Sequence, residues 1–227
     1  MSFKYKSVVP WGRSFNEYMD MFNLNENDIN KKILGCGDGP ASFNYEMTIR
    51  GKSVVSVDPI YKMKKEDIQT RINETYDDVI NQTRRNKDKF VWNKIRDVDQ
   101  LGQIRMNAMH LFLDDYEKGL KESRYIYAEL PNLPFKDNQF ELSLSSHFLF
   151  LYSDNLSFEF HLDAINEMLR VSNEVRIFPI LDVNAKKSPY IPDVRAQLDK
   201  SGFFSEIIRV PYEFQKNGNK MLKIYKK

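Results

Sequence analysis

The feature that most constrains the fold is a glycine-rich turn that follows a short strand-like segment at residues 32–34. Gly35, Gly37 and Gly39 alternate with other residues in this turn. Because glycine has no Cβ, such a turn can bend tightly and let a ligand approach the backbone. Pro40 suits the first turn of the helix that we expect next, and the free amides and dipole of that helix favour a carboxylate or a phosphate.

A second buried strand, residues 52–57, follows that helix and closes on Asp58. A carboxylate at this position can accept hydrogen bonds from both hydroxyls of a ribose. The order strand, glycine turn, helix, strand, acid is half of a doubly wound α/β sheet. The glycine spacing is G-x-G-x-G, which differs from the G-x-G-x-x-G of dinucleotide-binding proteins.

Later segments continue the same sheet and end it with an antiparallel hairpin. Asn217-Gly218 is a strong hairpin signal, because both residues tolerate a positive φ. A parallel α/β domain that ends in such a hairpin is an unusual arrangement, so the hairpin limits the number of folds that fit the sequence. The expected elements are strands at residues 125–129, 141–145 and 174–180, a helix at 159–170, and hairpin strands at 207–215 and 220–225.

Two segments lie outside this repeating pattern. Residues 63–122 are polar and helix-like, and we expect two to four helices there, inserted between the second and third strands of one domain that spans 1–227. A helix is also expected at 14–22, where Ser14 and Glu17 have the spacing of a capping box. We interpret residues 1–30 as a helical cap, which together with the insertion would form a lid and an acceptor pocket.

Composition excludes several other classes of protein. With 41% hydrophobic residues the chain can bury a core, and 34 basic against 32 acidic residues leave a net charge of only +2, which makes nucleic-acid binding by bulk electrostatics unlikely. One cysteine rules out an intramolecular disulfide and a multi-thiolate zinc site, and we expect no metal. The longest apolar runs are too short to span a membrane, and no signal peptide is evident, so we expect a cytoplasmic protein with no membrane partner.

Several stretches, in order and at suitable spacing, resemble class I S-adenosylmethionine-dependent methyltransferases. They are KKILGCGDGPASF, VVSVDPIY, LPNLPFKDNQFELSLSSHFLFLY, EMLRVSNEVRIFP and YEFQKNGNKMLKIY. They cover most of the chain outside the insertion, and together with WGRSFNEYMDMF they look like a bacterial methyltransferase-like family of unnamed substrate. The resemblance implies an α/β fold class: a Rossmann-like, doubly wound, seven-stranded and mostly parallel sheet with a C-terminal antiparallel hairpin.

The resemblance also implies a set of site residues, with S-adenosyl-L-methionine as the cofactor and a small-molecule acceptor. The glycine turn would cradle the methionine moiety, the acid after the second strand would hold the ribose, and the segment before LPF would meet the adenine. The end of the fourth strand would border the site of methyl transfer, where His147 is the candidate catalytic base. The implied cofactor residues are Gly35, Cys36, Gly37, Asp38, Asp58, Pro59, Glu129, Leu130, Ser145 and Ser146.

Two positions depart from the family pattern. Ile33 stands where many relatives carry an acid, so recognition of the cofactor amine must come from elsewhere, for example from Asp38. Ser172-Asn173 replaces the usual glycine turn before the fifth strand, a change that we expect to alter only a loop.

Each candidate residue also has a structural interpretation. The glycine turn could be an ordinary loop, Glu129 a solvated acid, His147 a buried structural histidine and Cys36 a packing residue. Residues 84–94 mix bases with Phe90 and Trp92, which could stack on nucleobases, but a solvated helix with an apolar stripe explains them too.

The leading hypothesis is therefore a methyltransferase that acts on a small or medium acceptor. A protein of this fold that binds the cofactor or a partner without catalysis is a second hypothesis, and an RNA-directed enzyme that uses the basic strip is a third. The D/N-P-P-Y loop of enzymes that methylate exocyclic base amines is absent after the fourth strand.

Overall fold

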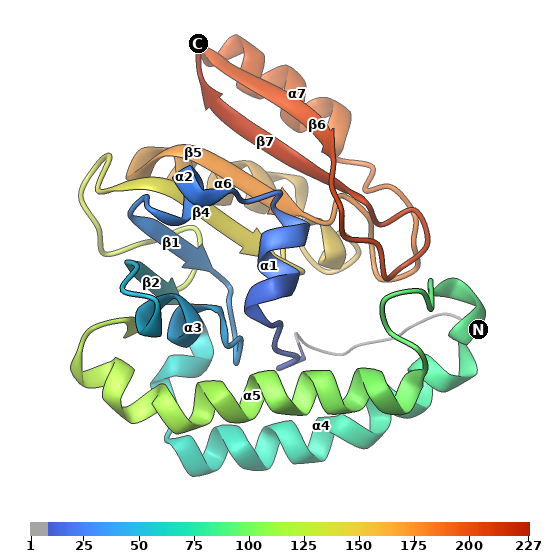
Figure 1. Ribbon diagram of the computed structural model, residues 1–227. Coiled ribbons are helices and arrows are strands. Elements are labelled where there is room, and N and C mark those ends of the chain that lie inside the picture. The colour runs from blue at the N-terminus through green and yellow to red at the C-terminus, as the bar shows by residue number, and fades with distance from the viewer. Residues whose placement is uncertain (1–8) are drawn as a thin grey trace.

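The computed structural model describes residues 9–227, whose seven strands form one sheet in the order β3-β2-β1-β4-β5-β7-β6 (Figure 1). All four residues of β1 are buried, as expected for a central strand covered on both faces. The strands are β1 (Ile33–Cys36), β2 (Val54–Val57), β3 (Tyr125–Ile126), β4 (Phe140–Ser146), β5 (Ser172–Phe178), β6 (Phe203–Arg209) and β7 (Lys220–Lys226).

Strands β1 to β5 are parallel, and β7 runs antiparallel between β5 and β6. Ser143 lies opposite Val175 in the β4–β5 pair, and Ile177 lies opposite Leu222 in the β5–β7 pair. A mostly parallel, seven-stranded, doubly wound sheet with a C-terminal antiparallel hairpin was the expected fold class, and it is confirmed.

Helices cover both faces of the sheet, and the alternation of side chains along each strand feeds two cores. Ile33 packs with α1 (Phe15–Met21) and α3 (Phe43–Ile49), whereas Leu34 packs with α6 (Phe158–Val171) and α7 (Ile191–Lys200). A short helix, α2 (Glu26–Ile29), connects α1 to the sheet, and 3-10 turns lie at η1 (Pro59–Lys62), η2 (Lys87–Lys89) and η3 (Phe150–Tyr152).

The expected insertion holds two long helices, α4 (Lys65–Arg85) and α5 (Val98–Lys121), which run antiparallel beside each other below the sheet in Figure 1. Asp97 caps α5 by accepting a 2.7 Å hydrogen bond from the Gln100 amide. A third core, which includes Tyr61, Phe112 and Tyr125, joins this helical pair to the edge of the sheet.

Helix α1 begins as its sequence predicts. The Ser14 side chain accepts from the Glu17 amide and the Glu17 carboxylate accepts from the Ser14 amide, which is a complete capping box. Of the cap predicted at 1–30, residues 1–8 lie outside the described residues, and 9–30 contain α1 and α2.

The segment after the glycine turn differs from the expectation. Helix α3 begins at Phe43 rather than at Pro40, and it has only seven residues. Gly37 and Gly39 adopt φ values of 70° and 53°, in the left-handed region, so the chain makes an extended turn before it becomes helical. The prediction that the turn opens directly into the helix at Pro40 is therefore wrong.

The predicted boundaries of β3 and of the terminal hairpin were also wrong. Strand β3 has two residues, because the chain turns away at 128–132, where the Asn132 amide bonds to the Glu129 carbonyl. The hairpin closes at the Arg209–Lys220 pair, and residues 210–219 form a loop. This loop has hydrogen bonds of its own and also bonds to the segment before α5, where the Val91 amide donates to the Phe214 carbonyl at 2.7 Å.

No loop separates α6 from β5 at Ser172-Asn173, where the sequence analysis expected an altered loop. Strand β5 begins at Ser172, directly after α6, and the buried Ser172 hydroxyl donates to the Met168 carbonyl at 2.6 Å.

None of the helices in the described part of the chain is both long enough and apolar enough to cross a membrane.

Candidate functional site

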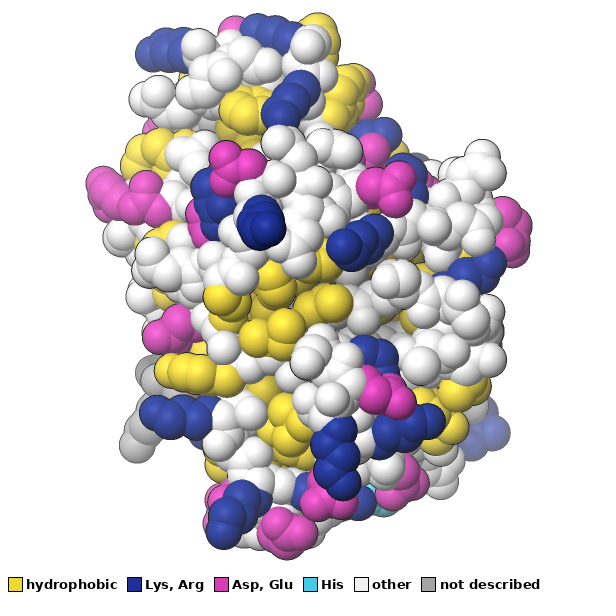
Figure 2. All heavy atoms as spheres, turned by 90° about the vertical axis from the view of Figure 1, so that its left-hand side faces the viewer, with side chains coloured by type: hydrophobic (Ala, Val, Ile, Leu, Met, Phe, Trp, Pro, Cys, Tyr) yellow, Lys and Arg dark blue, Asp and Glu magenta, His cyan; other side chains and the backbone are white. Residues whose placement is uncertain are grey.

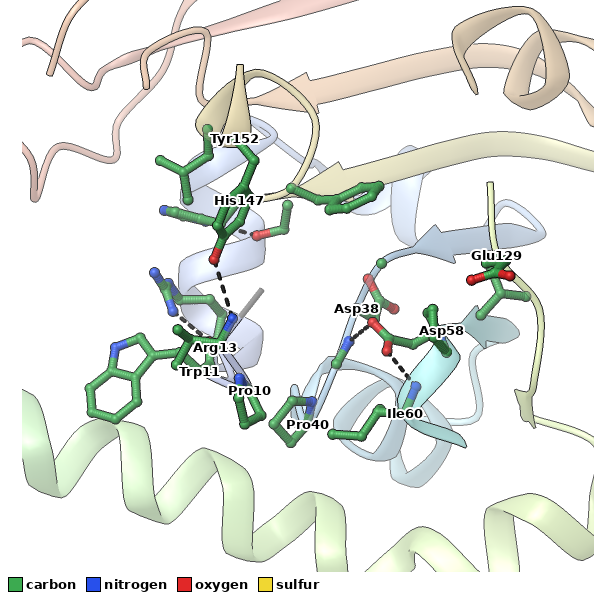
Figure 3. A pocket seen from close by; sticks show the side chains of 18 of the residues that line it. Pro10, Trp11, Arg13, Asp38, Pro40, Asp58, Ile60, Glu129, His147 and Tyr152 are labelled. Atoms are coloured by element: carbon green, nitrogen blue, oxygen red, sulfur yellow. Dashed lines mark hydrogen bonds between the residues drawn. The ribbon is translucent and has the colours of Figure 1, made fainter. Parts of the chain in front are cut away.

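A cavity of about 460 Å³ opens at the carboxyl ends of β1, β2 and β4. Parallel α/β sheets bind their ligands at this edge, where the connections diverge. Figure 3 shows two groups of lining residues on opposite sides of the cavity. We name them the acidic half, formed by Asp38, Asp58 and Glu129, and the basic half, formed by Trp11, Arg13, His147 and Tyr152.

The glycine turn shapes the acidic half. A Cβ on Gly37 would lie 3.2 Å from the Phe148 ring, and the φ of 70° is strained for any other residue. A Cβ on Gly35 would lie 1.8 Å from a carboxylate oxygen of Asp38, so only glycine leaves room for that side chain. The turn thus presents bare backbone to the cavity at residue 37.

Asp58 lies where the second strand ends, as the sequence predicts. Its two carboxylate oxygens accept 2.8 Å hydrogen bonds from the amides of Gly39 and Ile60. Burial raises the pKa of Asp58 to about 6, although these two amides favour the ionised form. Each oxygen keeps a further lone pair, so the carboxylate can still accept hydrogen bonds from a bound hydroxyl.

Asp38 lines the cavity, but its carboxylate is held by the protein. One oxygen accepts from the Tyr18 hydroxyl at 2.8 Å, and the other accepts from the Ser56 hydroxyl at 2.6 Å. Burial raises the pKa of Asp38 to about 6, although these hydrogen bonds lower it. These two hydrogen bonds hold the glycine turn against Tyr18 of α1 and Ser56 of β2.

Three more predicted cofactor residues line the acidic half, and Ser146 lies beside His147. Pro59, Glu129 and Leu130 border the cavity together with Asp58. The Glu129 side chain is exposed, whereas Leu130 is buried. A donor placed over the Leu130 wall could therefore reach the Glu129 carboxylate.

The other three predicted cofactor residues, Gly35, Cys36 and Ser145, do not line the cavity. Cys36 is the last residue of β1 and is fully buried in the core, where burial raises the pKa of its thiol well above the usual value. It is a packing residue. Ser145 is buried in β4, and its hydroxyl has no hydrogen-bond partner among residues 9–227.

His147 lies at the border between the two halves in an unusual backbone conformation. Its φ is 53°, and its amide donates to the Phe178 carbonyl. The ring Nδ1 is 3.0 Å from the Ser146 hydroxyl. Burial lowers the pKa of His147 well below its usual value, and the nearby guanidinium groups of Arg13 and Arg105 lower it further. The imidazole is therefore neutral near pH 7, the form that can accept a proton.

Beside the basic half lies a charged cluster that includes two residues the sequence analysis did not single out, Arg105 and Tyr212. Arg105 is fully buried in α5 and pairs with Glu17 of α1, whose other carboxylate oxygen accepts a 3.0 Å bond from the Tyr212 hydroxyl. Burial alone would raise the pKa of Glu17, but the charges of Arg105 and Arg13 outweigh it and hold this pKa at about 2. One signal was available: Arg105 interrupts an apolar helical stripe, four residues after Leu101 and four before Met109.

The aromatic residues of the basic strip at 84–94 are occupied by packing. Phe90 stacks on Phe214 with ring centroids 4.7 Å apart, and Trp92 contacts Phe214 edge-on. The Trp92 indole also donates to the Lys87 carbonyl. On the face shown in Figure 2, lysine and arginine side chains are interspersed with acidic ones and form no continuous basic surface.

Comparisons with solved structures point to proteins of similar architecture. The chain is similar to magnesium protoporphyrin IX methyltransferase (ChlM) from Synechocystis PCC 6803 with bound SAM, at 10% identity and a TM-score of 0.46, over 87% of this chain and 71% of that chain. It is also similar to the PH0226 protein from Pyrococcus horikoshii OT3, at 12% identity and a TM-score of 0.48, over 93% and 90% of the two chains.

A sequence relative is much closer. No protein-family model matches the chain. The uncharacterized protein MJ0045 of Methanocaldococcus jannaschii is 39% identical over 218 residues, which are 96% of each protein. This relative is archaeal, so the bacterial source expected from the sequence has no support. With this identity over nearly the full length, the chain belongs to the same family as MJ0045.

Proposed function

We propose that this protein is an S-adenosylmethionine-dependent methyltransferase that acts on a small or medium acceptor. The observation that carries the proposal is the cavity at the carboxyl edge of the sheet, with the bare backbone of Gly37 and the carboxylate of Asp58 on one side. The residues fit the cofactor: the turn leaves no side chain in the way at Gly37, and the carboxylates of Asp58 and Glu129, which line the cavity, can accept hydrogen bonds from hydroxyl and amino donors.

S-adenosylmethionine supplies, when bound, a methyl group on a sulfonium that departs as a neutral thioether. In our proposal Gly37 and its neighbours hold the methionine part, Asp58 accepts from the ribose hydroxyls, and Glu129 and Leu130 border the adenine. The chain's main work is then to align donor and acceptor and to exclude water.

His147 is the proposed base for an acceptor that must lose a proton. It lines the cavity between the two halves. In the neutral imidazole one ring nitrogen carries the proton, and the lone pair of the second nitrogen can accept a proton from the acceptor. An acceptor that is already ionised would need no base, and His147 would then serve to shape the site.

The direct test is calorimetric titration with S-adenosylmethionine and with its demethylated product, S-adenosylhomocysteine. We expect the wild type to bind both, and Asp58→Ala to bind at least tenfold more weakly, which corresponds to about 1.4 kcal/mol. Asp77→Ala removes an exposed carboxylate on α4, outside the cavity, and should bind as the wild type does. No binding by the wild type, or equal binding by Asp58→Ala, would overturn the cofactor assignment.

A second candidate is a protein that binds the cofactor without transferring its methyl group. The hydrogen bonds of Tyr18 and Ser56 to the Asp38 carboxylate favour this candidate, because they leave that carboxylate less free to bind the cofactor amine. The position where many relatives carry an acid is occupied by Ile33, which is buried and has no carboxylate. Cofactor binding without turnover over a broad panel of acceptors would support this candidate, and any methylated product would exclude it.

A further inference from the structure

The basic half of the cavity carries a positive charge that the described part of the protein does not neutralise. Arg105 pairs with Glu17, and Glu17 already accepts hydrogen bonds from Ser14 and Tyr212. Arg13 also lies in the field of Glu17 but forms no ion pair among residues 9–227. Two guanidinium groups against one carboxylate leave one positive charge.

Arg13 has unused hydrogen-bonding capacity. Its one hydrogen bond within residues 9–227 runs from a terminal nitrogen to the Trp11 carbonyl at 2.6 Å, and its Nε is buried without a partner. A guanidinium has five N–H donors in a fork that matches a carboxylate. Leaving a buried donor unpaired is costly, so the arrangement favours a ligand that supplies acceptor oxygens.

Arg13 also lines two neighbouring cavities. Beside the main cavity is a smaller one of about 110 Å³, which shares Trp11, Arg13 and His147 with it. A cavity on the order of 150 Å³ can hold a benzene ring, so the smaller space is near the size of one aromatic ring. Its lining includes the aromatic side chains of Phe90, Phe178, Tyr212 and Phe214, together with Arg105, which is paired with Glu17.

We propose that the basic half binds an acceptor that carries a carboxylate on an aromatic body, with Arg13 as the anion-binding residue. This inference rests on the proposed function, because it names the substrate class of the same site. A single unneutralised charge matches a monoanion better than the dianion of a phosphate monoester. The aromatic walls would bury the body of the acceptor and strengthen the ion pair by excluding water.

The other charges that line the main cavity do not change this assignment. Asp38, Asp58 and Glu129 lie across the cavity in the acidic half, and they would repel a carboxylate placed there. Arg71 also lines the cavity, but its charge lowers the pKa of Asp58, so we count Arg71 with the acidic half. The charge distribution therefore directs an anion toward Arg13.

The test compares three probes by ¹⁹F NMR titration, with and without S-adenosylhomocysteine: 4-fluorobenzoate, 4-fluorobenzamide and 4-fluorophenyl phosphate. We expect the wild type to bind the benzoate at least tenfold more tightly than the amide. Arg13→Met should abolish this preference, whereas Arg13→Lys, which keeps the charge but not the fork, should retain part of it. Arg84→Met, which removes an exposed arginine outside both cavities, should behave as the wild type does.

Several outcomes would overturn the inference. They are equal affinity for the benzoate and the amide, no binding of the benzoate, a preference that survives in Arg13→Met, or tighter binding of the phosphate than of the benzoate. Unchanged S-adenosylhomocysteine affinity of Arg13→Met shows that the variant is folded. If the wild type binds S-adenosylhomocysteine but shows no carboxylate preference, this inference alone fails. Absence of S-adenosylhomocysteine binding would overturn the proposed function instead.

Discussion

At the scale of single residues, Asp38 links the site to the pH dependence of folding. Its carboxyl is buried and its pKa is raised to about 6, above the value near 3.8 of an unfolded chain. The folded state therefore holds this proton more tightly than the unfolded state does. The resulting stabilisation is complete below pH 4 and is lost as the pH rises through 6.

We expect Asp38→Asn to remove the loss of folding stability that Asp38 causes as the pH rises through 6. The amide is similar in size to the carboxyl, and the hydroxyls of Tyr18 and Ser56 can rotate to suit it. Between pH 5 and pH 7 the free energy of unfolding of the wild type should fall by about 1 kcal/mol relative to the variant. Urea denaturation at the two pH values measures this difference, and parallel pH dependences would contradict the prediction.

At the scale of elements, α1 joins three parts of the chain through one side chain. Glu17 completes the capping box of α1, pairs with Arg105 of α5 and accepts from Tyr212 in the 210–219 loop. Because Arg105 is fully buried, its charge depends on this carboxylate.

Glu17→Gln should therefore destabilise the fold by about 3–5 kcal/mol, because it leaves the Arg105 guanidinium buried without a counter-charge. Ser14→Ala is the matched control, since it removes the side-chain half of the capping box but keeps the ion pair, and it should cost about 1 kcal/mol. Chemical denaturation at pH 7 gives both values. Equal losses in the two variants would show that the ion pair adds nothing beyond the cap.

Comparison with the sequence shows that local signals were sufficient for elements whose partners are also local. The capping box at Ser14, the buried strand β1 and the amphipathic α6 each depend on residues a few positions apart. The terminal hairpin was misplaced because its loop bonds to residues 89–91, a long-range contact that no short pattern specifies.

The candidate site divides in the same way. The acidic half follows from the glycine turn and from Asp58, both of which directly follow strands in the sequence. His147 was predicted, but the charged cluster beside it was missed, because Arg13, Arg105 and Tyr212 come from three distant segments and carry no shared spacing. Only their packing reveals that two arginines compete for one glutamate.

At the scale of the whole molecule, helix α4 of the inserted helical pair takes part in lining the main cavity. Met63, just before α4, and Arg71 and Val79 on α4 line the same cavity as the glycine turn. The segments that follow β1, β2 and β4 supply most of the cavity lining, and α4 together with residues 9–13 adds to it.

Hydrogen exchange measured by mass spectrometry should show this shared construction. If the proposed function holds, S-adenosylhomocysteine should slow amide exchange at residues 36–42 and 58–62, and also near the start of α4, because a ligand bridges these segments. Exchange in β6, the far edge strand, should not change. Protection confined to the glycine turn would show that α4 takes no part in binding.

The 210–219 loop has a consequence for the order in which the site is made. Residues 37–130 contribute the acidic half, whereas Tyr212 and Phe214, which line the smaller cavity beside Arg13, come later in the sequence. During translation the N-terminal parts of a protein emerge first. A chain that has not yet extended past residue 210 therefore lacks these two aromatic side chains, and the smaller cavity beside Arg13 is completed only when the 210–219 loop has been added.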